Sequence, residues 1–334
     1  MKEALYYESL TQNTVKCRLC PHDCVIKPGK RGVCGVRKNL EGKLYSENFG
    51  VVTGLGIDPI EKKPLYHFHP GRNILSVGSI GCNLKCFFCQ NWEISQVSDG
   101  DFPVKQTHSV EDIVKLAAKR SDNLGIAYTY NEPVIYYEFM IEVAREIRKR
   151  GMKNVMVTNG FINPEPLEEL ISVMDAFSVD LKGFTGEFYR QHTKSSLEPV
   201  KNTILQIGKS QAFLEITNLV IPGLNDQTEK FEQMLQWLAD NLGEKVILHI
   251  SRYYPGYHST IAPTSINKLQ EFYSLATQYL DYVYLGNVML EEGSNTYCDH
   301  CGKLLVRRSG YDTRIPGLDE SGRCKHCGNK VFIR

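Results

Sequence analysis

Three cysteines stand close together in the run from Gly81 to Asn91, at the spacing CxxxCxxC. Cys82, Cys86 and Cys89 supply three thiolates, one fewer than a cubane iron–sulfur cluster ordinarily takes from its protein. An iron without a cysteine ligand can bind a small chelating molecule, and the reduced cluster can pass an electron to it. A zinc site would use four protein ligands, and a disulfide would leave an odd thiol. The spacing therefore predicts an open-iron cluster, with a partial zinc site or buried thiols as the alternative.

The chain holds eleven cysteines, which fall into three groups with none left over. The groups are Cys17, Cys20, Cys24 and Cys34; Cys82, Cys86 and Cys89; and Cys298, Cys301, Cys324 and Cys327. In a secreted domain an even set of cysteines predicts disulfides, whereas short CxxC steps in an unexported chain favour metal. We therefore expect three metal sites.

The first cysteine group lies in a segment rich in proline and glycine and poor in periodic apolar residues. Such a segment cannot bury enough surface to fold alone, so a metal would supply the missing stability. We expect zinc on these four cysteines, with an auxiliary iron–sulfur cluster as the alternative, because thiolates bind both metals. His22 lies inside the loop and is expected to be a bystander.

The last cysteine group forms two CxxC knuckles, each followed by glycine (Gly302 and Gly328). Glycine permits the tight turn in which backbone amides face the sulfurs. This arrangement is typical of a zinc ribbon and predicts a structural zinc ion on Cys298, Cys301, Cys324 and Cys327.

Length and composition set further bounds. The 334 residues are 42% hydrophobic and 23% charged, which suits a sizeable core with a polar surface. Lys and Arg number 39 against 38 Asp and Glu, and the net charge of +1 gives no sign of nucleic-acid or membrane binding. The first residues lack the apolar core of a signal peptide, and no apolar run approaches a membrane span. We expect a cytoplasmic protein.

Strands and helices are expected to alternate from residue 74 onward. Apolar runs predict strands at 74–78, 125–128, 153–157, 176–181, 212–219, 246–250 and 282–285, and helical periodicity predicts helices at 110–120, 133–150, 165–173, 199–209, 227–241 and 265–279. Such alternation implies a parallel sheet, and six βα units are too few for the eight-stranded barrel. The expected fold class is therefore α/β, a partial and laterally open (β/α)6 barrel.

The chain is expected to divide into three parts: residues 1–72, an N-terminal segment and loop with a four-cysteine metal site; residues 73–290, the barrel; and residues 291–334, the ribbon-like module. Dense polar groups and prolines in residues 40–72 predict an ordered loop across the barrel mouth. Glu61 and His67 in this loop are expected to be satisfied surface residues, with a place in the substrate pocket as the alternative.

The cysteine motif, with the aromatic Phe88 before its third cysteine, resembles that of the radical S-adenosylmethionine (SAM) superfamily. Across nearly its whole length the chain resembles the radical SAM enzymes of the AmmeMemoRadiSam system, which are related to the activases of pyruvate formate-lyase. The resemblance rests on CRLCPHDC with GVCGVR, DPIEKKPLYHF, GCNLKCFFCQNW, TYNEP, LVIPGLND, LHISRYYP and the terminal knuckles. It implies a TIM-type radical SAM barrel with small four-cysteine metal-binding segments at both ends.

The resemblance also implies a SAM site at the strand ends. Asn131 and Glu132 occupy the place of a GGE motif that holds the methionyl ammonium, although Tyr and Asn replace its two glycines here. Thr158, Asn159 and Gly160 match a TNG motif, and Asp180 to Lys182 match a DLK motif in which lysine meets the carboxylate. His249, Ser251 and Arg252 are expected to reach the ribose or the substrate, with a structural role as the alternative, and residues 221–226 are expected to form a turn.

The resemblance implies that a [4Fe-4S] cluster on Cys82, Cys86 and Cys89 reductively cleaves SAM to a 5′-deoxyadenosyl radical, which abstracts hydrogen from an unidentified substrate. A flavodoxin or ferredoxin is the expected electron donor. The system's name implies AMMECR-type and Memo-type protein partners. The alternatives are activation of a glycyl-radical enzyme and, in another class, an interaction or nucleic-acid-binding protein that uses its zinc ribbon and carries an inactive barrel.

Overall fold

The computed structural model describes residues 1–97 and 107–331. Its centre is an eight-stranded sheet in the order β14-β13-β12-β11-β10-β9-β8-β7. The strands are β7 (Gly54–Pro59), β8 (Asn73–Gly78), β9 (Asn123–Tyr128), β10 (Lys153–Thr158), β11 (Ala176–Asp180), β12 (Phe213–Val220), β13 (Ile247–Arg252) and β14 (Tyr282–Gly286). Neighbours from β8 to β14 pair in parallel, and β7 pairs antiparallel with β8. Since β7 and β14 stand at opposite edges of this order, the sheet is laterally open.

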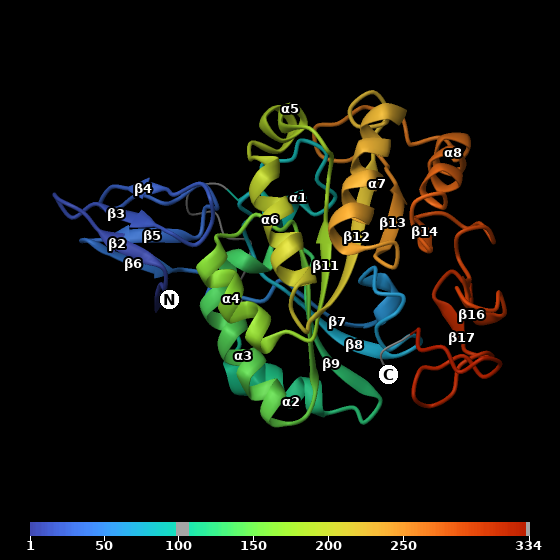
Figure 1. The fold of residues 1–334 in the computed structure, drawn as a ribbon. Coiled ribbons are helices and arrows are strands. Elements are labelled where there is room, and N and C mark those ends of the chain that lie inside the picture. Colours follow the sequence, from blue (N-terminus) through green and yellow to red (C-terminus); the bar gives the residue numbers. More distant parts are fainter. Residues whose placement is uncertain (98–106, 332–334) are drawn as a thin grey trace.

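Helices connect the successive parallel strands and lie along one side of the sheet in Figure 1. They are α2 (Val110–Ala118), α3 (Tyr137–Lys149), α4 (Pro164–Val173), α6 (Leu197–Gly208), α7 (Thr228–Leu242) and α8 (Ile266–Ala276). Short helical turns also follow strands, namely α1 (Trp92–Ser95), η2 (Pro133–Tyr136), α5 (Gly186–Phe188) and the π-helix η3 (Tyr189–Thr193). The predicted alternation and the partial (β/α)6 barrel are therefore confirmed, with element ends shifted by a few residues.

Sequence reasoning missed that β7 joins the central sheet and misplaced the segment that follows it. Ile60, Leu65 and Phe68 form a buried cluster with residues of the parallel strands, most of them near the amino ends of those strands. Those partners are Ile74, Leu124, Ala127, Val155, Ala176 and Phe213. The backbone N–H groups of Tyr66 and His67 also donate to Glu215 in β12, at 2.9 and 2.8 Å. The prediction that this loop crosses the barrel mouth is wrong for residues 60–68, which close the opposite end, whereas Asn48 and Thr53 donate to the Ile80 and Ser79 carbonyls just after β8.

Glu61 and His67 are correspondingly buried, at 3% and 1% exposure, so the prediction that they are surface residues is wrong. The short helix η1 (Ile60–Lys62) carries Glu61, whose Oε1 accepts the Gly71 N–H at 2.7 Å. His67 Nε2 lies 2.6 Å from the Tyr284 hydroxyl in β14. Both side chains therefore tie the closing segment to the rest of the fold.

Small sheets stand at both ends of the chain (Figure 1). The N-terminal pair is β1-β6-β5 and β2-β3-β4, with bounds β1 (Lys2–Glu3), β2 (Tyr7–Ser9), β3 (Val15–Cys17), β4 (Val25–Ile26), β5 (Arg37–Leu40) and β6 (Lys43–Ser46). The C-terminal sheet holds β15 (Thr296–Tyr297), β16 (Leu304–Ser309) and β17 (Asp312–Arg314). The division into three parts at residues 72 and 290 stays a prediction, although β7 pairs with the barrel.

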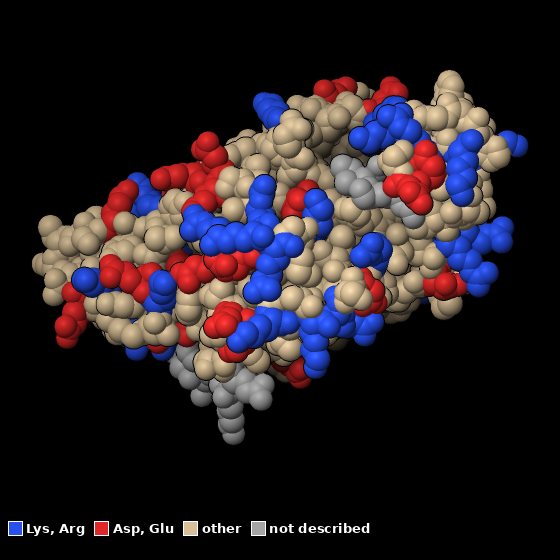
Figure 2. All heavy atoms as spheres, turned by 90° about the horizontal axis from the view of Figure 1, so that it is seen from below, with Lys and Arg blue, Asp and Glu red and all other residues tan. Residues whose placement is uncertain are grey.

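The surface agrees with the balanced composition. In Figure 2 basic and acidic side chains are interspersed on the face that is drawn. Within residues 1–97 and 107–331, no helix is long and apolar enough to cross a membrane.

Candidate active site

The cysteine loop follows the carboxyl end of β8 and is fixed there by Asn131. The Asn131 side chain accepts the Ser79 N–H at 2.9 Å and donates to the Gly81 carbonyl at 2.8 Å. The oxygen and the NH2 group of its side-chain amide thus both bond to the backbone just before Cys82. These contacts position the loop that carries the cysteines, and the expected contact of Asn131 with an ammonium stays a prediction, because its amide oxygen retains a second lone pair.

Glu132 joins the loops after β9 and β10. One carboxylate oxygen accepts the Thr158 hydroxyl at 2.7 Å and the Val134 N–H at 3.0 Å, while the other accepts the Asn159 N–H at 2.8 Å. Burial raises the pKa of Glu132 to about 7 despite these hydrogen bonds. Since a carboxylate oxygen has two lone pairs, the oxygen that accepts from Asn159 retains room for one more donor.

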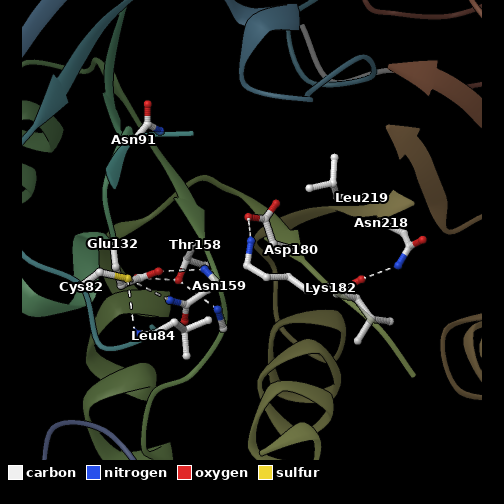
Figure 3. Close-up of polar contacts among 12 residues, drawn as sticks. Cys82, Leu84, Asn91, Glu132, Thr158, Asn159, Asp180, Lys182, Asn218 and Leu219 are labelled. Carbon is white, nitrogen blue, oxygen red and sulfur yellow. Dashed lines mark hydrogen bonds and ion pairs between the residues drawn. The ribbon is translucent and has the colours of Figure 1, made fainter. Parts of the chain in front are cut away.

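Asn159 and Leu84 direct N–H groups at Cys82 (Figure 3). The Leu84 N–H lies 3.3 Å from the Cys82 sulfur, and the Asn159 amide donates to the Asn83 side chain at 2.9 Å with the same sulfur at 3.8 Å. Donors of this kind stabilise a thiolate and tune a metal bound to it. Burial and the nearby Glu132 carboxylate raise the pKa of Cys82, so a positive metal centre would be needed to ionise it.

Asp180 and Lys182 pair with each other on the side of the site opposite Cys82 (Figure 3). The Lys182 Nζ lies 2.8 Å from an Asp180 carboxylate oxygen, and the Lys182 N–H donates to the Tyr189 hydroxyl at 3.1 Å. Burial lowers the pKa of Lys182, but the Asp180 carboxylate and Cys86 outweigh this and leave it above the ordinary value. Lys182 is therefore a charged donor, and an ammonium with one partner retains two N–H groups for a ligand.

The loops around this pair are held by asparagines. Asn218 donates to the Leu181 carbonyl and Asn225 to the Lys182 carbonyl, each at 2.7 Å. The Asn225 side chain also accepts the Ile221 N–H at 2.6 Å, which confirms the turn predicted at residues 221–226.

Phe88 is buried at 3% exposure and packs near Phe188 and Tyr253, with ring centroids 6.4 and 6.5 Å away. The Cys89 N–H donates to the Cys86 carbonyl at 3.3 Å, which makes a turn of the last part of the motif. Aromatic packing therefore anchors the cysteine loop against the segments that follow β11 and β13.

The structure does not bring His249 to the residues around Cys82 and Lys182. Its Nε2 lies 2.6 Å from Glu215, and its ring packs against Tyr66, in the buried network at the amino end of the barrel. Glu215 also accepts the backbone N–H of Tyr66. These contacts favour the structural alternative for His249 over contact with the ribose.

Ser251 and Arg252 lie at the carboxyl end of β13. Ser251 is buried beside Gly286, and the Arg252 Nε donates to the Thr264 carbonyl at 2.8 Å. Arg252 also lines a pocket of about 990 Å³ between β13, β14 and the ribbon. The neighbouring Tyr254 carbonyl accepts from Gln90 at 2.7 Å, so this pocket adjoins the end of the cysteine loop.

Tyr130 is a residue whose role sequence reasoning missed. Its φ of 71° lies in the left-handed region that favours glycine, so this loop keeps a glycine-like backbone where tyrosine replaces the first glycine of GGE. Its ring covers Gly54 and Gly78, where an added Cβ would come within 2.6 and 2.8 Å of ring atoms. The Tyr130 carbonyl accepts from Asn91 at 2.6 Å, which ties the end of the cysteine loop to the loop after β9.

The C-terminal cysteines come together as one compact group. The sulfurs of Cys298, Cys301, Cys324 and Cys327 all lie within 4.8 Å of one another. Gly302 and Gly328, each with positive φ, donate N–H groups to the carbonyls of the first cysteine in their knuckles at 2.8 Å. This spacing suits one tetrahedral ion with thiolate ligands. The N-terminal Cys17, Cys20, Cys24 and Cys34 instead line a small cavity.

Comparisons with known proteins agree with this geometry. A family model described as "Radical SAM superfamily" matches residues 77–238. An uncharacterized protein of Methanocaldococcus jannaschii is 44% identical over 100% of this chain and 99% of its own length. The pyruvate formate-lyase 1-activating enzyme of Escherichia coli strain K12 is 22% identical over 54% of this chain and 75% of that protein. A radical SAM methyltransferase structure from Sphaerobacter thermophilus has a TM-score of 0.52 at 14% identity, covers 71% of each chain and shows a shared fold.

Proposed function

This chain belongs to the radical SAM superfamily, and we propose that it cleaves SAM reductively at a [4Fe-4S] cluster on Cys82, Cys86 and Cys89. The observation that carries the proposal is the placement of these cysteines, Glu132 and Lys182 around one carboxyl edge of the parallel sheet. When bound, the cluster supplies the electron that breaks the SAM sulfonium and yields a 5′-deoxyadenosyl radical able to abstract hydrogen.

The residues present fit such a cluster. Three cysteines follow β8, and the Cys82 sulfur has N–H donors from Leu84 and Asn159, as thiolate ligands commonly have. Cys86 is buried, and burial raises its pKa to about 12 while the Lys182 charge opposes this, so Lys182 lies close enough to act on it. A cationic iron centre would convert these thiols into thiolates.

We assign the two ends of the methionyl group to opposite sides of the site. Glu132 has acceptor capacity left on one oxygen for an ammonium, and Lys182 has N–H groups left for a carboxylate. Thr158 and Asn159 hold the Glu132 carboxylate in place. The pocket beside Arg252 is the proposed route of the substrate, because it adjoins the end of the cysteine loop.

The test is anaerobic reconstitution with iron, sulfide, SAM and a reductant, followed by measurement of 5′-deoxyadenosine. We expect product with reduced flavodoxin or ferredoxin and with dithionite. A reconstituted protein that holds its iron and binds SAM but forms no 5′-deoxyadenosine under either reductant would refute the proposal. Addition of AMMECR-type and Memo-type proteins, which we propose as partners, would then show whether hydrogen is abstracted from them or from a molecule they bind.

A second candidate function is activation of a glycyl-radical enzyme, favoured by the similarity to the pyruvate formate-lyase 1-activating enzyme. The activase would abstract hydrogen from a backbone glycine of its partner. A glycyl-radical signal in electron paramagnetic resonance (EPR), formed when the reduced protein and SAM meet a glycyl-radical enzyme from the same organism, would support this function.

We also propose that the C-terminal cysteines hold a structural zinc ion. Their sulfurs have the close spacing of a tetrahedral site, and the knuckle glycines supply the turns. The Asn329 amide adds a donor 3.9 Å from the Cys298 sulfur. Zinc carries no redox chemistry, so this site would stabilise the ribbon rather than take part in the reaction.

Lys182→Ala is expected to weaken SAM binding about tenfold without changing the iron content. Loss of a hydrogen bond to a charged group costs about 1.5–3 kcal/mol, and about 1.4 kcal/mol is a factor of ten in affinity. SAM titration of the reconstituted protein measures the change. Lys115→Ala on α2, where the lysine side chain is 65% exposed, is the matched control and should bind SAM normally. Equal SAM affinity in the two variants would remove Lys182 from the site.

Glu132→Gln is expected to weaken SAM binding and to lower thermal stability. Glutamine keeps the shape but turns N–H donors toward Asn159 or Thr158, which leaves a buried donor unpaired at a cost of about 1–3 kcal/mol. Calorimetry of the protein without SAM and SAM titration separate the two effects. Glu165→Gln, at an exposed position in the first turn of α4, is the control. A stability loss with unchanged SAM affinity would limit Glu132 to a structural role.

A further inference from the structure

The two four-cysteine groups differ in the spacing of their sulfurs. Zinc–sulfur bonds of about 2.3 Å place the four sulfurs of a tetrahedral site about 3.8 Å apart. The C-terminal group has this character, with all sulfurs within 4.8 Å. Cys17, Cys20, Cys24 and Cys34 also lie in the described part of the chain, yet among the described residues the C-terminal cysteines are the group close enough to share one metal ion. The N-terminal group is therefore not arranged around a single ion.

These four cysteines surround a cavity instead. The other residues that line it are Leu19, His22, Ile26, Gly32, Val33, Arg37 and Ile135. A cubane cluster binds each cysteine thiolate to a different iron. The four cysteine sulfurs therefore stand farther apart than they do around a single ion and surround a space that the cluster fills. At Gly32 an added Cβ would lie 3.3 Å from Ile26 and 3.5 Å from the Cys24 sulfur, so glycine leaves this wall open.

Arg37, which lines the cavity, carries buried N–H donors that lack an acceptor. Its side chain is 1% exposed, and Nη2 donates to the Leu5 carbonyl at 2.6 Å and to Glu138 at 2.8 Å. Nε and Nη1 are buried and have no hydrogen-bond partner among the described residues. Glu138 neutralises the guanidinium charge, but the two buried N–H donors without an acceptor are costly, and a metal centre with four thiolates supplies sulfur acceptors for them. Thiolate acceptors are supplied by a zinc site or by a cubane cluster, whereas the spacing of the cysteine sulfurs favours the cubane.

The cavity lies directly against the cysteine loop of the active site. His22, which lines it, places Nε2 2.7 Å from the Asn83 carbonyl, beside Cys82. The Cys34 carbonyl oxygen lies 2.7 Å from where a Cβ of Gly81 would stand, and Gly81 has a φ of +87°. The two cysteine segments thus pack backbone to backbone, and only glycine fits between them. His22 therefore links the two segments, while the prediction that it takes no part in binding the metal stays a prediction.

We propose that Cys17, Cys20, Cys24 and Cys34 hold a second [4Fe-4S] cluster, which receives electrons for the cluster on Cys82, Cys86 and Cys89. One electron from a reduced flavodoxin or ferredoxin reduces the N-terminal cluster. The same electron then passes to the neighbouring cluster, and the N-terminal cluster returns to its oxidised state. The relay rests on the proposed function, whereas the identity of the metal does not.

The test uses the chain with Cys82, Cys86 and Cys89 all replaced by alanine, reconstituted without oxygen. We expect about four iron atoms and about one zinc atom per chain to remain, and the wild type to hold about eight irons. A variant with no iron and about two zincs would overturn the cluster. Iron that stays after Cys17 and Cys20 are also replaced by alanine would show non-specific binding and would overturn it too. If that variant does not fold, the iron count and Mössbauer spectrum of the wild type still decide.

The same triple variant tests electron entry. Reduced flavodoxin should produce an EPR signal of about one spin per chain from the remaining cluster, as dithionite does. If dithionite produces the EPR signal but neither reduced flavodoxin nor reduced ferredoxin does, the electron relay is refuted, although the cluster assignment stands. Failure of the proposed function would look different: the wild type would show both clusters and form no 5′-deoxyadenosine.

Discussion

Replacing Cys82, Cys86 and Cys89 together by alanine is expected to abolish 5′-deoxyadenosine formation. The three thiolates are the only ligands that we assign to the active-site cluster, and the electron that cleaves SAM has no other entry to the site in our proposal. Iron content should fall by about four atoms per chain. Chromatography of the reaction mixture with dithionite as the reductant measures the product directly.

Lys85→Ala is the matched control for this variant, because Lys85 lies in the same loop without being a proposed ligand. Its backbone N–H donates to the Thr193 carbonyl at 2.9 Å, and this contact survives the substitution. The control should keep its iron and its activity within about twofold, as surface substitutions usually do. SAM cleavage that persists in the triple alanine variant would refute the assignment of radical SAM chemistry to this site.

Removal of zinc by a strong chelator is expected to unfold residues 296–331 while the barrel stays folded. The ribbon's buried cluster consists of Cys298, Leu305, Val306, Leu318 and Cys324, and two of these five are proposed ligands. So small a core cannot hold a fold by itself, and structural zinc contributes about 10–16 kcal/mol in comparable small modules. Limited proteolysis, followed by mass spectrometry of the fragments, should show cleavage within the ribbon only after zinc is lost.

Unfolding of the ribbon should also destabilise the amino end of the barrel. Arg308 is 4% exposed and donates to the Tyr66 carbonyl at 2.7 Å, and Thr296 lies 2.7 Å from the Tyr284 hydroxyl. We therefore expect the protein without zinc to have a lower melting temperature than the protein with zinc. His300→Ala and His326→Ala are the controls, since these exposed residues lie inside the knuckles and are not proposed ligands. Zinc loss in either control, or a ribbon that resists protease without zinc, would contradict the assignment.

Local patterns in the sequence determined much of this protein. The CxxxCxxC spacing, the apolar runs of the strands and the helical periods between them are short-range features, and each predicts its element without knowledge of the rest. Because parallel strands place their carboxyl ends at one edge, the polar residues after β8, β9, β10 and β11 could be assigned to one site. Glu132 and Lys182 do share that edge in the structure, and their proposed contacts with SAM stay predictions.

Contacts between distant segments were decided only by the tertiary structure. Asn131 could accept from a ligand or hold a loop, and the structure shows that it hydrogen-bonds to Ser79 and Gly81. His249 lies in the same strand as Arg252, yet its position earlier in β13 places it beside Glu215, toward the amino end of the barrel. The alternation along a strand predicts on which face of the sheet a side chain lies. It does not predict which residue of a distant segment will contact that side chain.

The cysteine groups show the same division. Their spacing along the chain predicts three metal sites, because ligand pairs within a knuckle are local. Spacing could not distinguish zinc from a cluster at Cys17, Cys20, Cys24 and Cys34, since both metals accept four thiolates. The distances between sulfurs, the unpaired donors of Arg37 and the contact of Cys34 with Gly81 depend on how β5 and the cysteine loop pack together. Such packing joins residues far apart in sequence, so only the folded chain reveals it.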